Sequence, residues 1–426
     1  MKQLPKGWSH QKLGDLIELK YGTALPQKTR TNDGHPVFGS NGKIGEHNPA
    51  LTSGETLIVG RKGSIGEVHY SPMACTPIDT TYYIDNVPDN TFKYWFHSLK
   101  SLNLNKLNKS TAIPGLSRND VYNIDVPVPP TNEQRRIADK LDRVLARVDA
   151  ANEHLSRIAP LIKRFRQSVL SAATSGKLTS DLHRDNRNAY ERLPLGDLAS
   201  TRLGKMLDKK KNTGTLVKYI RNVNVRWFSF DLSDLLSIRI EPHEVQTLSI
   251  QDGDVLICEG GEPGRCAVWR EGSTDLVFQK AIHRARLDSK LLLPEWLAFC
   301  LKHQSNTGEI EDFFTGTTIK HLTGVSLAKL LIPVPPIEEQ CEIVRRVEKL
   351  FAFADRLEER LSQAQEAVQK LTPALLAKAF RGELVPQDPN DEPASELLKR
   401  LQESRANDTK TRRARKPRAT SAVEPS

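Results

Sequence analysis

Two long segments of the chain carry an apolar residue at every third or fourth position, with mostly polar or charged residues between. The steps alternate between four and three over about 33 positions in each segment, which is the period of a coiled-coil stripe. A single buried core helix is the alternative, but most such helices are far shorter. We therefore predict two long helices whose stripes pack on each other. The main stripe positions are Ile137, Leu141, Val144, Val148, Leu155, Ile343, Val347, Leu350, Leu357 and Leu361.

These segments belong to a longer internal repeat. IDVPVPPTNEQRRIADKLDRVLARVD at 124–149 matches LLIPVPPIEEQCEIVRRVEKLFAFAD at 330–355, 206 positions later, and the offset holds as far as SGKL at 175–178 and RGEL at 381–384. The proline runs mark the helix starts, because proline is excluded from a helix interior. Upstream the offset changes to 198, where RKGSIG ends at Gly66 and GGEPG ends at Gly264. A repeat of about 200 residues is too long for a solenoid unit and indicates a duplicated domain pair.

The segments that precede the repeated helices differ in length and letters. Short strand-like runs such as ETLIVG, GEVHY and TYYID alternate with glycine-rich turns, so each segment is predicted to be a mixed α/β domain. The predicted organisation is a first variable domain at 1–125, a helical region at 126–180, a second variable domain at 189–332, a helical region at 333–385 and a basic tail at 386–426.

The composition argues against a membrane protein, a secreted protein and a zinc-binding protein. The net charge of the 426 residues is +10, and the stretch from Arg405 to Ser426 holds seven Lys and Arg against two acids, so the tail is expected to be disordered. No apolar run approaches the length of a membrane span, and the N-terminus resembles no secretion signal. Five cysteines without a C-x-x-C pair favour a reducing, cytoplasmic setting without a zinc site.

The sequence contains none of the common catalytic motifs. There is no H-E-x-x-H, no G-x-S-x-G, no Walker loop and no dinucleotide fingerprint, and each Pro-Pro lies in V-P-P rather than in the motif of amino-methylating enzymes. We therefore expect a protein that positions other molecules, with no catalytic residue, no metal and no cofactor of its own.

The glycine-rich loops are the candidate DNA contacts. GSNGKIGE and GRKGSIGE share the form G-x-x-G-x-I-G-E, and tight turns of this kind bring the backbone close to a ligand; turns without a ligand are the alternative. Arg, Asn and Glu can pair with base edges, whereas Lys mostly contacts phosphates. The candidates in the first domain are Asn41, Lys43, Arg61, Lys62 and Ser64; those in the second are Arg221, Asn222, Asn224, Glu259, Arg265, Lys320 and His321.

These features together resemble the specificity subunit of type I restriction-modification enzymes. Two unlike domains, each followed by a PVPP…EQ…I helix ending in GKL or GEL, form the family's pattern, and LIKRFRQSVLSAATSGKLT at 161–179 is close to its central conserved region. GRKGSIG and the STAIPGL segment at 110–116 resemble parts of its target recognition domains. The resemblance extends to about Pro386 and leaves out the basic tail.

The resemblance implies a fold and a set of partners. It implies two α+β target recognition domains, separated by two long helices that form an antiparallel coiled coil, in a pseudo-two-fold repeat. It also implies a bipartite, asymmetric double-stranded DNA target whose spacer the helices fix. Two modification subunits, which use S-adenosylmethionine, and restriction subunits, which use ATP and Mg²⁺, would be the partners, with no membrane involved. A coiled-coil scaffold that does not read sequence, and a stand-alone regulator with a palindromic site, are the rival hypotheses.

Overall fold

The computed structural model describes residues 4–107, 115–182, 190–206, 208, 212–272 and 274–414, and its contacts divide the chain into two compact units. The first unit consists of Met1–Leu155 and Ala364–Ser426, and the second consists of Ser156–Gln363. Each unit therefore combines one variable domain with parts of both long helices.

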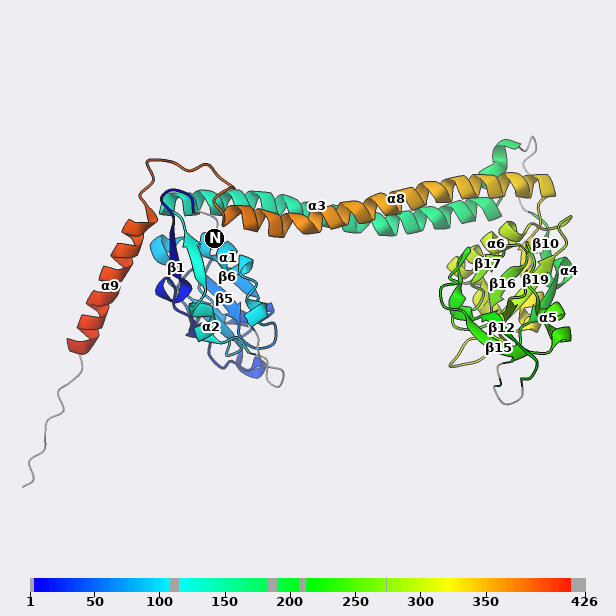
Figure 1. Ribbon diagram of the computed structural model, residues 1–426, viewed down its shortest axis with the longest axis horizontal. Helices are drawn as coiled ribbons and strands as arrows, with labels where there is room; N and C mark the ends of the chain where they lie inside the picture. The colour runs from blue at the N-terminus through cyan, green and yellow to red at the C-terminus, as the bar shows by residue number, and fades with distance from the viewer. Residues whose placement is uncertain are drawn as a thin grey trace, which may run out of the picture. The chain divides into compact units, whose positions relative to one another are not determined.

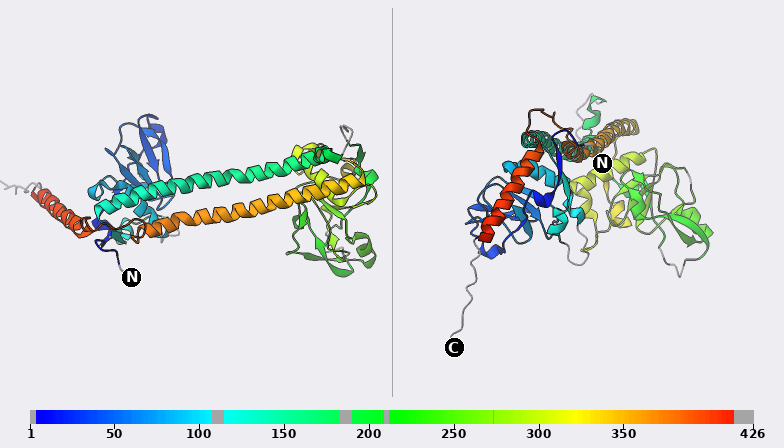
Figure 2. Two further views of the ribbon diagram at one scale, coloured as in Figure 1. Left: turned by 90° about the horizontal axis from the view of Figure 1, so that it is seen from above. Right: turned by 60° about the vertical axis from the view of Figure 1, so that its left-hand side comes forward.

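The predicted long helices are present. α3 spans Thr131–Thr174 and α8 spans Ile337–Ala379. Within the first unit, the N-terminal part of α3 lies beside the C-terminal part of α8, and within the second unit the C-terminal part of α3 lies beside the N-terminal part of α8 (Figures 1 and 2). Because both helices are continuous, this order is antiparallel, as predicted. All ten main stripe positions are buried or half-buried.

In its described residues, the first unit contains three sheets, and the helices α1 and α2 accompany the long ones. The four-stranded antiparallel sheet has the order β2-β8-β5-β6, the three-stranded sheet has the order β4-β3-β7, and β1 pairs with β9. β5 is buried along its whole length because it pairs on both sides. The bounds are β1 Ser9–Lys12, β2 Lys20–Tyr21, β3 His35–Gly39, β4 Gly42–His47, β5 Thr56–Gly60, β6 Val68–Ser71, β7 Thr76–Pro77, β8 Thr81–Ile84, α1 Phe92–Ser101, α2 Arg118–Tyr122 and β9 Asp125–Val128.

The second unit repeats this topology with different side chains. Its sheets have the orders β11-β19-β16-β17 and β15-β12-β18, β10 pairs with β20, and β13 and β14 form an additional hairpin. The bounds are β10 Arg192–Pro194, α4 Leu195–Leu198, β11 Ala199–Leu203, β12 Thr215–Ile220, β13 Val225–Arg226, β14 Ser229–Phe230, β15 Leu236–Ile240, α5 Pro242–Leu248, β16 Val255–Cys258, β17 Cys266–Val268, β18 Val277–Phe278, β19 Ile282–Leu287, α6 Pro294–Thr307, α7 Gly324–Ala328 and β20 Leu331–Pro333.

Each variable domain shares its hydrophobic core with the long helices. Ile137 and Leu141 of α3 are fully buried in the cluster that contains Trp95 of α1, and Ile343 of α8 is buried with Trp296 of α6. The compact units consequently do not end at 125 and 332, where the variable segments give way to the repeated helical segments. The first turns of each stripe anchor a variable domain as well as the partner helix, so the domain's orientation on its helix is fixed by packing.

The expectation of a disordered tail from residue 386 was wrong for its first part. α9 spans Ala394–Ala414, and Ala394 and Leu397 are buried in the core of the first unit, with Leu398 and Leu401 packed against it. The Ala394 N–H donates to the Gly7 carbonyl (2.9 Å). Leucines at three- or four-position steps form a narrow apolar face, which is sufficient when the helix docks on an existing core. Residues 415–426 lie outside the described part of the chain.

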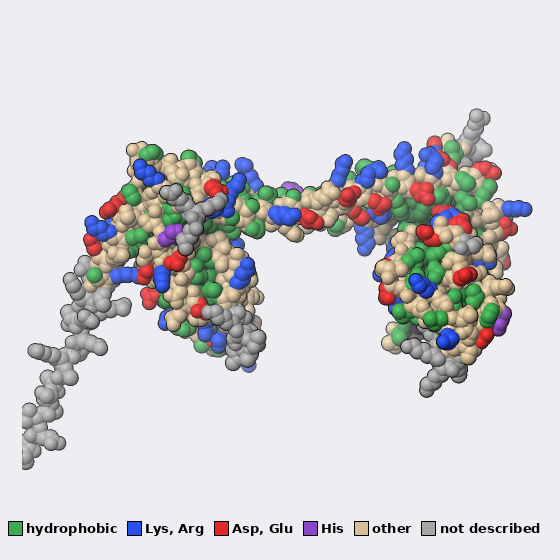
Figure 3. All heavy atoms as spheres, viewed as in Figure 1, with side chains coloured by type: hydrophobic (Ala, Val, Ile, Leu, Met, Phe, Trp, Pro, Cys, Tyr) green, Lys and Arg blue, Asp and Glu red, His purple; other side chains and the backbone are tan. Residues whose placement is uncertain are grey.

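The exposed helix faces carry charges of both signs. Lys and Arg side chains as well as Asp and Glu side chains lie along the long helices (Figure 3). Among the described helices, none has the length and apolarity required to cross a bilayer.

Candidate nucleic-acid interface

In the first unit, two glycine-rich loops meet. The hairpin turn Ser40–Asn41 joins β3 to β4, and residues 61–66 follow β5. The Ser64 N–H donates to Ser40 Oγ (3.4 Å), and the His69 ring nitrogen Nε2 lies 3.1 Å from the Ser40 carbonyl oxygen. The fold therefore brings the two G-x-x-G-x-I-G-E loops together, although β4 and β5 separate them along the sequence.

Four of the five candidates of the first domain lie on these two loops, and Lys43 lies near the start of β4. Asn41, Lys43 and Lys62 are exposed, whereas Arg61 and Ser64 are half-buried. Lys43 forms an ion pair with Glu46 (2.8 Å) on the same strand. Arg61 Nη2 donates to the Asp79 carbonyl oxygen (2.6 Å). Of the STAIPGL segment, residues 110–114 lie outside the described part of the chain; Leu116 donates its N–H to the Arg61 carbonyl oxygen (2.9 Å).

Sequence reasoning missed an aromatic ring that lies near two guanidinium groups. Tyr21, 54% exposed, lies with its ring centroid 5.4 Å from Arg61 Cζ and 5.3 Å from Arg118 Cζ. The buried Tyr82 ring is 5.1 Å from Tyr21, because the two residues are partners in the β2–β8 ladder. Burial raises the pKa of Tyr82 to about 12, so this phenol stays neutral. No local sequence motif marks Tyr21 or Tyr82, because only strand pairing brings these two residues close to Arg61.

The corresponding loop of the second unit has the same backbone hydrogen bonds. Gly60 and Gly66 in the first unit donate to the carbonyl oxygens of Glu67 and Gly60 (both 2.8 Å). Their counterparts at the upstream repeat offset, Cys258 and Gly264, donate to the carbonyl oxygens of Arg265 (2.7 Å) and Cys258 (2.9 Å).

Both loops also require glycine at their final turn. At Gly66 (φ +77°) a Cβ would lie 2.4 Å from Asn105 N, and at Gly264 (φ +89°) it would lie 2.4 Å from Ile310 Cδ1. The two domains thus share one loop frame, meaning the same loop backbone conformation, and carry different side chains on it.

Three predicted residues of the second domain form one turn, Arg221–Asn224. Arg221 pairs with Asp234 (2.7 Å), and the Asn222 carbonyl oxygen accepts from Arg265 Nη2 (2.8 Å). Asn224 is only 3% exposed, and its amide bonds to the backbone at Arg221 N (2.9 Å) and Asp231 O (2.9 Å). Within the triplet, Asn224 therefore shapes the turn, and Arg221 and Asn222 are the half-exposed members.

The remaining candidates of the second domain lie around the same turn. Arg265 forms an ion pair with Glu262 (3.0 Å) besides its bond to Asn222. Lys320 and His321 are exposed, and a Cβ added at Gly260 would lie 3.3 Å from the His321 ring nitrogen Nδ1. Glu259 is half-buried and follows β16 directly. The structure thus gathers the predicted residues of each domain around one loop cluster.

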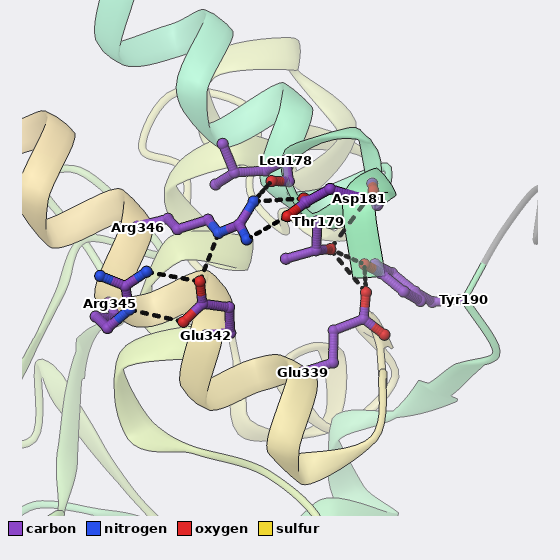
Figure 4. Close-up of polar contacts among 9 residues, drawn as sticks. Leu178, Thr179, Asp181, Tyr190, Glu339, Glu342, Arg345 and Arg346 are labelled. Atoms are coloured by element: carbon purple, nitrogen blue, oxygen red, sulfur yellow. Dashed lines mark hydrogen bonds and ion pairs between the residues drawn. The ribbon is translucent and has the colours of Figure 1, made fainter. Parts of the chain in front are cut away.

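At the N-terminus of α8, a buried carboxylate joins three segments of the second unit (Figure 4). Glu339 Oε1 accepts hydrogen bonds from Thr179 Oγ1 and from the Tyr190 hydroxyl, both at 2.7 Å. Thr179 follows α3, and Tyr190 precedes β10. Two turns further along α8, Arg346 forms an ion pair with Asp181 (2.6 Å) and also donates to the Leu178 carbonyl oxygen (2.8 Å).

The first unit has the equivalent junction at the N-terminus of α3. Glu133, the repeat equivalent of Glu339, accepts from Trp8 Nε1 (2.9 Å) and from Gln387 Nε2 (3.1 Å). Burial raises the pKa of Glu133, although both hydrogen bonds lower it. In both units the Glu of the repeated E-Q motif thus ties the start of one long helix to the segment after the other long helix.

The chain is similar to known proteins over most of its length. A family model described as the type I restriction modification DNA specificity domain matches twice, at residues 5–159 and 188–366. The specificity subunit of the type I restriction enzyme EcoDI from Escherichia coli is 27% identical over 95% of this chain and 96% of its own. That of EcoBI, also from Escherichia coli, is 31% identical over 74% and 72%. That of EcoKI from Escherichia coli K12 is 31% identical, but the match spans 64% of its length.

Solved structures share the fold at low identity. The HsdS subunit from Thermoanaerobacter tengcongensis superimposes with a TM-score of 0.56 at 19% identity, covering 90% of this chain and 98% of its own. A chain from a study of the assembly and conformational transition of the type I R-M system gives a TM-score of 0.62 at 18% identity, covering 90% and 100%. The repeated domain match, the repeated topology and the paired long helices lead to one conclusion: this chain belongs to the type I restriction-modification DNA specificity family.

Proposed function

We propose that the chain is the DNA-reading subunit of a type I restriction-modification complex and binds a bipartite, asymmetric double-stranded target. The observation that carries this proposal is one loop frame presented twice with different side chains. Base edges are distinguished by the donors and acceptors that reach them, so two domains with one frame and different side chains would read two different half-sites.

Catalysis belongs to partner subunits in this proposal. Two modification subunits would bind S-adenosylmethionine and methylate the DNA, and restriction subunits would use ATP and Mg²⁺, so the chain itself would need no cofactor. The relatives are named as specificity subunits of restriction enzymes, which supports this division of labour. The complex would act in the cytoplasm, where the chromosome is accessible.

The long helices would set the spacer between the half-sites. A helix rises about 1.5 Å per residue, and each base pair adds about 3.4 Å to duplex DNA, so helix length converts into a number of base pairs. The junctions at Glu133 and Glu339 support this role, because they fix where each helix begins relative to the end of the other helix in the same unit.

The test is to express the full chain with its modification subunits in a host that lacks other methyltransferases, and to map methylated bases across the genome. We expect one bipartite sequence with unlike halves. Exchanging residues 1–125 for those of a relative should change one half only, and exchanging 189–332 should change the other half. A coiled-coil scaffold would give no sequence-specific methylation that depends on these domains. Loss of both halves from one exchange would contradict independent readers.

A further inference from the structure

Positions 61 and 259 are equivalent in the two domains. The Arg61 N–H donates to the Thr80 carbonyl oxygen and the Glu259 N–H to that of Ala281, each at 2.9 Å. The Arg61 carbonyl oxygen accepts from Leu116 N–H (2.9 Å), and that of Glu259 accepts from Leu322 N–H (2.8 Å). One backbone position therefore carries opposite charges in the two domains.

The Arg61 guanidinium is held in place without being neutralised. Its Nη2 bonds to the Asp79 carbonyl oxygen, and its Cζ lies 5.4 Å from the Tyr21 ring and 5.9 Å from the Tyr82 ring. Within the described ranges, no carboxylate lies within ion-pair distance of Arg61 or of Arg118, whose Cζ is 5.3 Å from the same Tyr21 ring. A guanidinium stacked on aromatic rings has a fixed orientation, so less side-chain entropy is lost when it donates a pair of hydrogen bonds.

The second domain lacks every part of this cationic cluster. His283 is the counterpart of Tyr82, because the Tyr82 hydroxyl bonds to the Leu116 carbonyl oxygen (3.0 Å) and the His283 ring to the equivalent Leu322 carbonyl oxygen (2.9 Å). Leu203 is then the counterpart of Tyr21, since Leu203 pairs with His283 as Tyr21 pairs with Tyr82. Gly324 stands at the repeat equivalent of Arg118.

The Glu259 carboxylate is half-buried. Among the described residues it has no hydrogen-bond or ion-pair partner, and Arg265 pairs with Glu262. It is therefore available to accept a hydrogen bond from a ligand.

A phosphate contact does not explain this position in both domains. Every DNA sequence offers the same anionic phosphates, and a carboxylate repels them, so Glu259 is unsuited to that role. Base edges differ: guanine presents two acceptors in the major groove, O6 and N7, whereas cytosine presents the N4 amino donor. Arginine only donates hydrogen bonds, and an ionised glutamate only accepts them.

We infer that Arg61 and Glu259 are equivalent specificity-determining residues that read a G·C base pair in opposite orientations, Arg61 from the guanine and Glu259 from the cytosine. This inference rests on the proposed function, namely that both domains read DNA, and adds to it the residue and the base read by each. Tyr21 is the positioning residue for Arg61.

The test selects bound sequences from a random pool of duplex DNA with the full chain in complex with its modification subunits. Arg61→Ala should reduce the preference for G at one position of the first half-site by roughly 5- to 150-fold, with the second half-site unchanged. Arg61→Lys should lose the same preference while keeping most of the affinity, because lysine retains the charge but not the planar fork. Glu259→Gln should change a C preference to A in the second half-site, since glutamine pairs with adenine N6 and N7.

Controls separate the inference from the proposed function. Lys12→Ala and Glu271→Gln, exposed and outside both loop clusters, should leave the selected letters unchanged. If the wild-type complex selects no bipartite sequence, the proposed function fails. If the wild type selects one and the Arg61 and Glu259 variants select the same letters, or if Arg61→Lys retains full selectivity, the inference alone is overturned.

Discussion

Removal of the Glu339 carboxylate should open the junction at the N-terminus of α8. Glu339 and Thr179 are both buried, and the carboxylate accepts two hydrogen bonds of 2.7 Å from Thr179 and Tyr190. In Glu339→Ala both hydroxyl groups lose this acceptor in a site that water reaches poorly. The segment after α3, residues 177–182, should then detach more often from α8.

The size of the effect follows from these two bonds. A hydrogen bond to a charged group contributes about 1.5–3 kcal/mol, but part of the sum is offset because the variant no longer desolvates a carboxylate. We expect a net loss of about 2–4 kcal/mol in the free energy of local opening, which corresponds to a roughly 30- to 800-fold rise in the opening equilibrium. Glu339→Gln keeps one acceptor oxygen and should lose about half as much.

Hydrogen exchange measured by mass spectrometry reports this opening directly, because amide protection in residues 177–182 depends on it. The matched control is Glu338→Ala, since Glu338 is the adjacent residue on α8 and is exposed. Protection of 177–182 in the Glu338 variant should equal that of the wild type. If Glu339→Ala exchanges this segment no faster than Glu338→Ala does, the junction does not depend on the buried carboxylate.

Three further predictions concern α9 and the helices. The ion pair with Arg136 (2.5 Å) lowers the pKa of Asp391 in the folded chain. The ion pair therefore stabilises the docked segment before α9 fully above the unfolded-state pKa of about 4, and this stabilisation is lost as the pH falls through the lowered pKa of the folded state. Hydrogen exchange at 386–397 should therefore differ between wild type and Asp391→Asn at pH 7, and this difference should shrink at pH 3. Leu397→Ala, at a site 2% exposed, should weaken α9 docking by about 2–4 kcal/mol and speed proteolysis within α9, whereas the exposed control Gln402→Ala should not. Four residues inserted after Ala151 should change the spacer of the methylated sequence or abolish methylation without changing the half-site letters; methylation mapping that finds the wild-type spacer at full efficiency would refute the spacer role.

The parts of the structure that sequence could predict have local or repeated signals. The regular apolar period predicted α3 and α8, and all ten stripe positions are buried or half-buried. The order of the glycine-rich loops in the repeat, at an offset of 198, predicted their equivalence, which the shared hydrogen bonds support. α9 was missed because its charged composition concealed a face of only a few apolar residues. The roles of the individual loop residues in DNA binding stay predictions.

The sequence by itself determined the two long helices, the duplication and the family, because helix period and repeated letters are properties of the covalent order. Only the tertiary structure decided which residues meet. Tyr21 reaches Arg61 through strand pairing, Glu339 reaches Thr179 across 160 positions, and Leu397 reaches the core of the first unit from the far end of the chain. Such contacts depend on how strands pair and how helix ends dock, and these long-range arrangements leave no periodic signal along the chain.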